Sequence, residues 1–135
     1  MKKYSERRRF HRFPFDARCE LVVAGQRHLC DLLDISINGA LIEPVGDLDL
    51  PTGDGRLLLE VRGELAGDEI AFSVVVDVVR LESMRMACRF VEVDVDSFES
   101  LKDLVADNLG DLELLDRELT QLDYWPGLAP ARAVG

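Results

Sequence analysis

The sequence predicts a mainly β fold, an antiparallel meander or small barrel that is followed by a C-terminal helical segment. Between residues 16 and 95, short segments of alternating apolar and polar residues follow one another, with the period of half-buried strands. The connections between these segments are brief and rich in turn residues, which argues against alternating βαβ units. After Val95 the apolar residues recur with helical spacing instead.

Six strands are expected in chain order, and most are joined by tight turns. Hairpin turns are predicted at Ala24-Gly25, Ala66-Gly67 and Glu82-Ser83. Asn38 and Gly39 form another turn, since both residues tolerate a positive φ. A loop rich in Pro, Gly and Asp occupies residues 44–55. The expected strands are residues 16–23, 27–35, 39–43, 56–65, 69–81 and 84–93.

Two helical stretches are expected after the last strand. Asp96 followed by Glu99 resembles a capping box, and Gly110 provides a helix stop. A second amphipathic stretch, rich in leucine, covers residues 112–122 and is expected to pack on the barrel or on the first helix. The chain then divides into a flexible basic arm (1–15), a β-barrel (16–95), a helical segment (96–123) and a disordered tail (124–135).

The charge is distributed unevenly along the chain. The net charge is −10, yet the first 18 residues contain seven basic and two acidic residues. An acidic body with a basic arm disfavours long nucleic acids, which need many phosphate contacts, but suits a small anion held by a few arginines. No apolar run approaches the ~20 residues of a membrane span. We therefore expect a cytoplasmic monomer that does not insert into membranes.

Two motifs carry candidate binding chemistry. Arg8 and Arg12 lie four residues apart in the arm, beside Arg7 and Arg9, and guanidinium groups bind phosphate oxygens in pairs or stack on purines. The stretch from Asp34 through Ser36 to Gly39 ends a strand with a carboxylate, a hydroxyl and a residue without a side chain. Taken singly, the first motif also fits a solvated basic tail and the second an ordinary Asx or ST turn.

The ordered pair of motifs resembles the signature of the PilZ domain family. That signature is RxxxR on an N-terminal segment, followed some twenty to thirty residues later by [DN]xSxxG. Both halves are intact here, as Arg8 to Arg12 and as Asp34, Ser36 and Gly39. The resemblance covers roughly residues 5–122 and implies a six-stranded antiparallel PilZ-type barrel with a C-terminal helix or helices.

The resemblance implies a receptor or adaptor for the second messenger cyclic di-GMP, which changes arm conformation on binding and signals to an effector protein. Arg8 and Arg12 would contact phosphates and guanines, while Asp34 and Ser36 would bind a guanine edge and a nearby phosphate. Gly39 would shape the turn. Arg7, before the first signature arginine, favours a stacked pair of nucleotides, so two per protein are expected. Outside the signature, Arg9 and Arg80 are added as candidate ligand-binding residues, Arg80 for stacking.

Other functions fit the residues less well. No Gly-rich phosphate loop, nucleophile elbow or metal motif accompanies the histidines and cysteines, so we expect neither catalysis nor a metal. Cys19, Cys30 and Cys88 have no CxxC spacing and read as buried, reduced thiols. A nucleic-acid polymer is disfavoured by the acidic body. The alternative that stays open is a ligand-independent protein–protein adaptor that uses the leucine-rich helix at 112–122.

Overall fold

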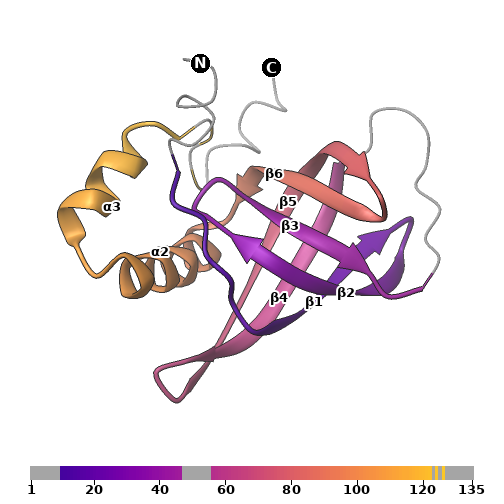
Figure 1. The fold of residues 1–135 in the computed structure, drawn as a ribbon, viewed down its shortest axis with the longest axis horizontal. Helices are drawn as coiled ribbons and strands as arrows, with labels where there is room; N and C mark the ends of the chain where they lie inside the picture. The colour runs from indigo at the N-terminus through magenta and orange to yellow at the C-terminus, as the bar shows by residue number, and fades with distance from the viewer. Residues whose placement is uncertain (1–9, 47–55, 123, 125, 127–135) are drawn as a thin grey trace.

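A closed β-barrel carries two helices on one side (Figure 1). The computed structural model describes residues 10–46, 56–122, Tyr124 and Pro126. The antiparallel strands are joined in the order β1-β2-β3-β6-β5-β4, and β1 pairs with β4 to close the barrel. In chain order they are β1 (Ala17–Val23), β2 (Gln26–Ile35), β3 (Gly39–Pro44), β4 (Arg56–Leu65), β5 (Asp68–Glu82) and β6 (Arg85–Val93). The predicted fold class is confirmed.

Tight hairpins connect neighbouring strands because their central residues adopt positive φ angles. Ala24 and Gly25 join β1 to β2, with φ angles of 51° and 83°. Ser83 and Met84 join β5 to β6 with φ angles of 50° and 70°, although neither is a glycine. Two-residue loops of this kind match the right-handed twist of the flanking strands.

The barrel interior is filled by the alternate residues of every strand. Leu21, Ile35, Ile42, Leu59 and Phe90 are among the side chains with no exposed surface. The cysteines at 19, 30 and 88 are buried and free of disulfides, as predicted. Alternation of this kind follows from the pleat, which turns successive side chains to opposite faces.

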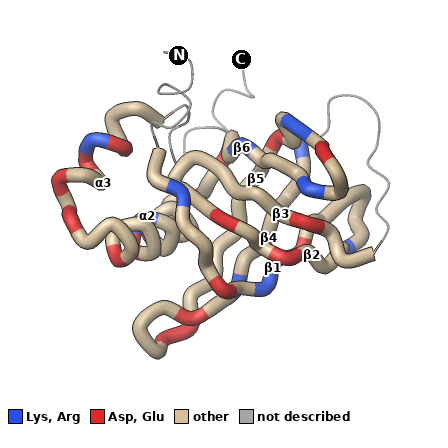
Figure 2. Tube along the Cα trace, in the orientation of Figure 1, with Lys and Arg blue, Asp and Glu red and all other residues tan. Residues whose placement is uncertain are grey.

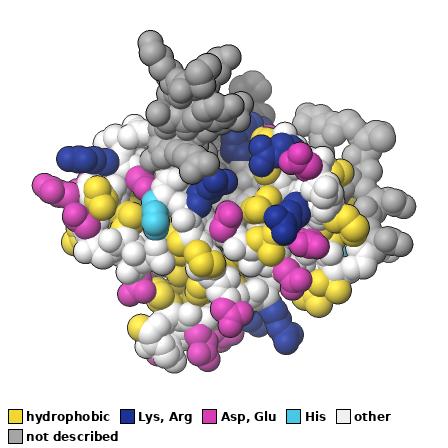
Figure 3. Space-filling model, viewed as in Figure 1, with side chains coloured by type: hydrophobic (Ala, Val, Ile, Leu, Met, Phe, Trp, Pro, Cys, Tyr) yellow, Lys and Arg dark blue, Asp and Glu magenta, His cyan; other side chains and the backbone are white. Residues whose placement is uncertain are grey.

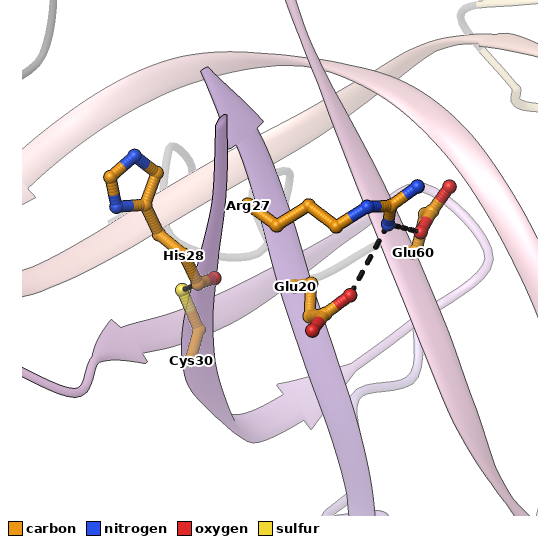
Figure 4. Close-up of polar contacts among 5 residues, drawn as sticks. All are labelled: Glu20, Arg27, His28, Cys30 and Glu60. Atoms are coloured by element: carbon orange, nitrogen blue, oxygen red, sulfur yellow. Dashed lines mark hydrogen bonds and ion pairs between the residues drawn. The ribbon is translucent and has the colours of Figure 1, made fainter. Parts of the chain in front are cut away.

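On the outer surface, one arginine forms ion pairs with two carboxylates that face each other across neighbouring strands. Glu20 on β1 and Glu60 on β4 lie directly opposite each other, a placement that destabilises a strand pair when both are charged. Arg27, at the start of β2, donates to both carboxylates (Figure 4). These bonds raise the pKa of Arg27, with Glu60 the larger cause.

The helices α2 (Val95–Leu109) and α3 (Leu112–Leu119) follow the barrel. The N-cap of α2 is Asp94, two residues before the expected capping box, and its carboxylate accepts from the Ser97 backbone N–H. Hydrogen bonding to Ser97, to its side chain first and to its backbone N–H second, lowers the pKa of Asp94. The Ser97 hydroxyl in turn accepts from the backbone N–H of Ser73 on β5, at 3.0 Å, which fixes the helix start against the sheet.

Helix α2 packs on β5 through Phe98, Leu101, Leu104 and Val105, the face that its sequence spacing predicted. Helix α3 packs on α2, and acidic residues occur along both helices (Figure 2). Within the described part of the chain, neither helix is long and apolar enough to cross a membrane.

The segments on either side of the barrel differ from the expected arm and tail. The expected arm covers residues 1–15, of which residues 1–9 lie outside the described residues. Residues 10–15 lie along the barrel, where Phe13 is buried and pairs with Ile35. At the other end Tyr124, which falls in the expected tail, is buried. Burial of each aromatic side chain contributes to holding its segment against the body of the protein.

Candidate functional site

A cavity of about 490 Å³ opens at the barrel surface between the N-terminal segment, β3, β5 and β6. Its volume falls within the ~300–1,000 Å³ that is typical of small-molecule sites. It is lined by Phe10, Arg12, Asp34, Ser36, Asn38, Gly39, Ala40, Leu41, Val79, Arg80, Ala87, Cys88 and Arg89. Arg12, Asp34, Ser36, Gly39 and Arg80 were all predicted from the sequence, and the fold brings them together. The predicted residues Arg7, Arg8 and Arg9 lie outside the described residues.

Arg12 reaches the cavity because its neighbour Phe13 is anchored. The backbone N–H of Phe13 donates to the Ile35 carbonyl at 3.0 Å, and the Ile35 N–H donates back at 2.9 Å. This antiparallel bridge places Arg12 level with Ser36, so the two motifs meet although 23 residues separate them in sequence. Among the described residues, the exposed guanidinium of Arg12 has no ion-pair partner.

Ser36 holds the loop that joins β2 to β3. Its side chain is 4% exposed, and its hydroxyl accepts from the backbone N–H groups of Asn38 and Gly39, each at 3.1 Å. The Ser36 N–H donates to the Gly39 carbonyl at 2.8 Å. These are the bonds of an ST turn, so Ser36 orders the loop as well as lining the cavity.

Gly39 is required for a reason that the sequence did not indicate. We expected turn chemistry with a positive φ at Asn38 or Gly39, but neither residue has one. Instead, a Cβ on Gly39 would lie 2.4 Å from the backbone oxygen of Cys88 on β6. The absence of a side chain therefore lets β3 approach β6 closely along this wall of the cavity.

Two β-bulges lie beside the cavity. The register of β2 against β3 shifts between Leu32 and Asp34, and that of β5 against β6 shifts between Val78 and Arg80. A bulge turns the following side chain to a new direction, and bulges are frequent next to binding sites for that reason. Asp34 and Arg80 are thus brought into the cavity lining by irregularities in otherwise regular strands.

Arg89 is a lining residue that was not predicted. It pairs with Gly39 across β3 and β6, and its guanidinium donates to Asp77 at 3.1 Å. Alternation along β6 indicates an outward-facing residue here, but only the pairing with β3 reveals its proximity to Asp34. Arg80 also has a carboxylate neighbour, with its Nε 3.7 Å from Glu82. Figure 3 shows several basic side chains gathered on this face, with apolar side chains between them.

The cavity combines three guanidinium groups with one carboxylate, in a chain whose net charge is negative. Arg12, Arg80 and Arg89 can bind phosphate oxygens in pairs or stack on an aromatic ring. Asp34 can accept from two adjacent N–H donors. Apolar lining from Val79 and Leu41 completes the wall. A small phosphorylated molecule with an aromatic base therefore suits the site chemically.

A small closed barrel with an arginine-lined cavity at its surface defines a class of compact binding module. The model of the PilZ domain family matches residues 6–107, and the chain therefore belongs to the PilZ domain family. The match includes both sequence motifs and all six strands.

Solved structures of low identity share the fold. One is the PilZ domain of CeSA from a cellulose-synthesizing bacterium, with 20% identity, a TM-score of 0.53, and coverage of 75% of this chain and 99% of that chain. A second is the Bacillus subtilis inhibitor of motility MotI/DgrA, with 18% identity, a TM-score of 0.55 and coverage of 76% and 51%. A third is the K. pneumonia MrkH–c-di-GMP complex, with 22% identity, a TM-score of 0.52 and coverage of 78% and 54%. This chain spans about half the length of the latter two.

Proposed function

We propose that this chain is a cyclic di-GMP receptor that passes the signal to a partner protein. The observation that carries the proposal is the meeting of Arg12 with Asp34 and Ser36 at one cavity, because these residues come from the two halves of the PilZ signature. The structural likeness to a MrkH–c-di-GMP complex supports the same ligand.

The proposed roles follow from the chemistry of each side chain. Arg12, together with Arg8, contacts phosphates and guanines of the nucleotide, and Asp34 accepts from the paired N–H donors of a guanine edge. Ser36 holds the loop against the ligand. Arg80 provides a stacking plane, and its position in the lining supports this role. Arg89 provides a further cation at the same wall.

Binding is proposed to change the position of the N-terminal arginines. Arg7, Arg8 and Arg9 lie three to five residues before Arg12, so neutralisation of their charges by the ligand favours closure of that stretch over the cavity. The altered surface would then be recognised by an effector protein. Two leucines on α3, Leu112 (69% exposed) and Leu114 (40% exposed), are available to a partner.

The same two leucines favour a second candidate function, a protein–protein adaptor that works without a nucleotide. Leu115 on that helix is buried, so the exposed pair is in excess of what packing on α2 requires. The two functions differ in the role of the cavity, which the adaptor does not use.

Titration calorimetry at physiological salt tests the receptor function directly. We expect a Kd for cyclic di-GMP of about 1 μM or tighter, which corresponds to roughly −8 kcal/mol. Repeating the titration over a range of salt separates this ligand from a nucleic-acid polymer, whose affinity falls about 10³–10⁵-fold between 50 and 200 mM salt. A protein that gives no heat and no change in its NMR spectrum with cyclic di-GMP is not its receptor.

A further inference from the structure

The C-terminal segment contacts the N-terminal segment beside the cavity without lining the cavity itself. The backbone N–H of His11 donates to Oε2 of Glu118 on α3 at 2.7 Å. The His11 ring nitrogen Nε2 lies 2.7 Å from Oδ1 of Asn108, near the end of α2. His11 also stacks on Phe13, with ring centroids 5.6 Å apart. Both helices therefore hold the residue that precedes Arg12.

Glu118 makes this contact with a side chain that is buried and therefore poorly hydrated. The residue is only 7% exposed, and burial raises the pKa of its carboxyl, an effect that the His11 N–H partly opposes. Its second oxygen, Oε1, has no hydrogen-bond partner among the described residues. Burying a carboxylate that makes only one strong hydrogen bond costs free energy of desolvation, so this arrangement is more often kept for a specific contact. The contact it makes is with the arm.

Tyr124 makes a matching contact with the second motif. Its hydroxyl donates to the carbonyl oxygen of Ile37 at 2.6 Å, and its side chain is 5% exposed. The ring packs edge-to-face on Phe98 of α2 at a centroid distance of 6.1 Å. Burial raises the pKa of the Tyr124 hydroxyl, so the group stays a donor. Ile37 lies in the loop between Ser36 and Gly39.

The two contacts fall on residues that alternate with the cavity lining. His11 precedes Arg12, and Ile37 lies between Ser36 and Asn38, while Arg12, Ser36 and Asn38 line the cavity. The C-terminal segment thus supports, from outside the cavity, the same two segments that line it. Figure 1 shows the indigo N-terminal segment running beside the two helices.

We propose that Glu118 and Tyr124 are positioning residues for the nucleotide site, and that they couple occupancy of the cavity to the order of α3. This inference rests on the proposed function, cyclic di-GMP binding. Glu118 holds the backbone next to Arg12 and Tyr124 holds the loop of the second motif, so both are ordered before the ligand arrives. Because coupling between two sites is reciprocal, a nucleotide in the cavity stabilises α3 in return.

The test begins with amide hydrogen exchange on the full chain. Cyclic di-GMP should slow exchange in α3 of the wild type, although no residue of α3 lines the cavity. Without ligand, Glu118→Gln should speed exchange at residues 10–13, and Tyr124→Phe should do the same at residues 36–39. The control is Glu113→Gln, the same change at an exposed position of α3, which should alter neither.

Calorimetry on the same proteins measures the positioning effect. Each of Glu118→Gln and Tyr124→Phe should weaken cyclic di-GMP binding about tenfold, since backbone that was ordered in advance must now be ordered on binding. Both variants should retain cooperative thermal unfolding, and the protection of α3 by ligand should be lost. Emission of the single tryptophan, Trp125, provides an independent signal next to Tyr124.

The outcomes separate the two proposals. A wild type that binds no cyclic di-GMP overturns the proposed function and the coupling with it. If the wild type binds, but α3 exchanges at the same rate with and without ligand and both variants bind as tightly as the control, the proposed function stands. In that case Glu118 and Tyr124 are structural residues alone, and the coupling is overturned.

Discussion

At the scale of single residues, Arg12 is the cavity residue whose loss separates binding from folding. Arg12→Ala should weaken cyclic di-GMP binding by about 2–4 kcal/mol, since it removes charge-assisted hydrogen bonds and a stacking plane. Thermal stability without ligand should barely change, because the side chain is exposed and has no ion-pair partner among the described residues.

Arg18→Ala is the matched control for this measurement, because Arg18 is also exposed but lies outside the cavity lining. Calorimetry and thermal unfolding of both variants check the prediction. Unfolding of Arg12→Ala with its ligand affinity intact would contradict the assigned role.

Individual residues of the cavity were predictable where a motif marked them. Arg12, Asp34, Ser36 and Gly39 come from the signature, and each lines the cavity. Arg89 was missed because its proximity to the site depends on the pairing of β6 with β3, and nothing local to its sequence encodes that pairing. The burial of Tyr124 was missed for the same reason, since its partners Ile37 and Phe98 are distant in sequence.

At the scale of elements, the contact between β3 and β6 depends on Gly39. In Gly39→Ala, an ideal Cβ would lie 2.4 Å from the backbone oxygen of Cys88, so the two strands must move apart. Overpacking of this kind costs about 1–3 kcal/mol of stability. Cyclic di-GMP binding should weaken as well, because Arg89 lies opposite Gly39.

Gly25→Ala controls for the loss of a glycine, since Gly25 has a positive φ and open space around it. That variant should lose some stability and keep its full affinity. Equal affinities of the Gly39→Ala and wild-type proteins, measured by calorimetry, would contradict a role for this strand contact in the site.

The hairpin between β5 and β6 offers a stabilising change. Met84 has a φ of 70° and a side chain that is 53% exposed, so its conformation is strained and little packing is at stake. Met84→Gly should raise the free energy of unfolding by about 0.5–1 kcal/mol. The reverse change in the equivalent turn, Gly67→Met, should lower it. Urea unfolding of both variants tests the sign, and a less stable Met84→Gly protein would refute the strain.

Periodicity predicted the strands and helices more reliably than it predicted the β-bulges and the helix cap. The alternation of apolar residues marked all six strands to within one or two residues at each end. The bulges at Asp34 and Arg80 leave no such mark, because they arise from the register of two strands together. The cap of α2 was placed at Asp96 rather than Asp94 because both aspartates precede the same apolar face.

At the scale of the whole molecule, charge balance gives an expected number of ligands per protein. A pair of cyclic dinucleotides carries about four phosphate charges, which Arg7, Arg8, Arg9 and Arg12 together would match. We expect two nucleotides per protein at saturation, and a shift toward one with weaker apparent affinity in Arg7→Leu.

Native mass spectrometry of the wild type and of Arg7→Leu decides the ligand count, with Lys2→Leu as a control for the loss of a nearby positive charge. A single nucleotide bound to the saturated wild type would refute the charge balance while leaving the receptor function in place.

Closure of the barrel also limits how this protein can meet others. With β1 paired to β4, the sheet formed by the six strands has no outer strand whose N–H and C=O groups await a partner. An approaching polypeptide therefore cannot extend this sheet by adding a strand of its own, which is a common mode of peptide recognition and also of aggregation. A partner that binds the barrel or the helices must instead contact side chains, on the helices, on the hairpins or at the mouth of the cavity. Recognition of the barrel is thereby confined to the side chains that its strands and hairpins present at the surface.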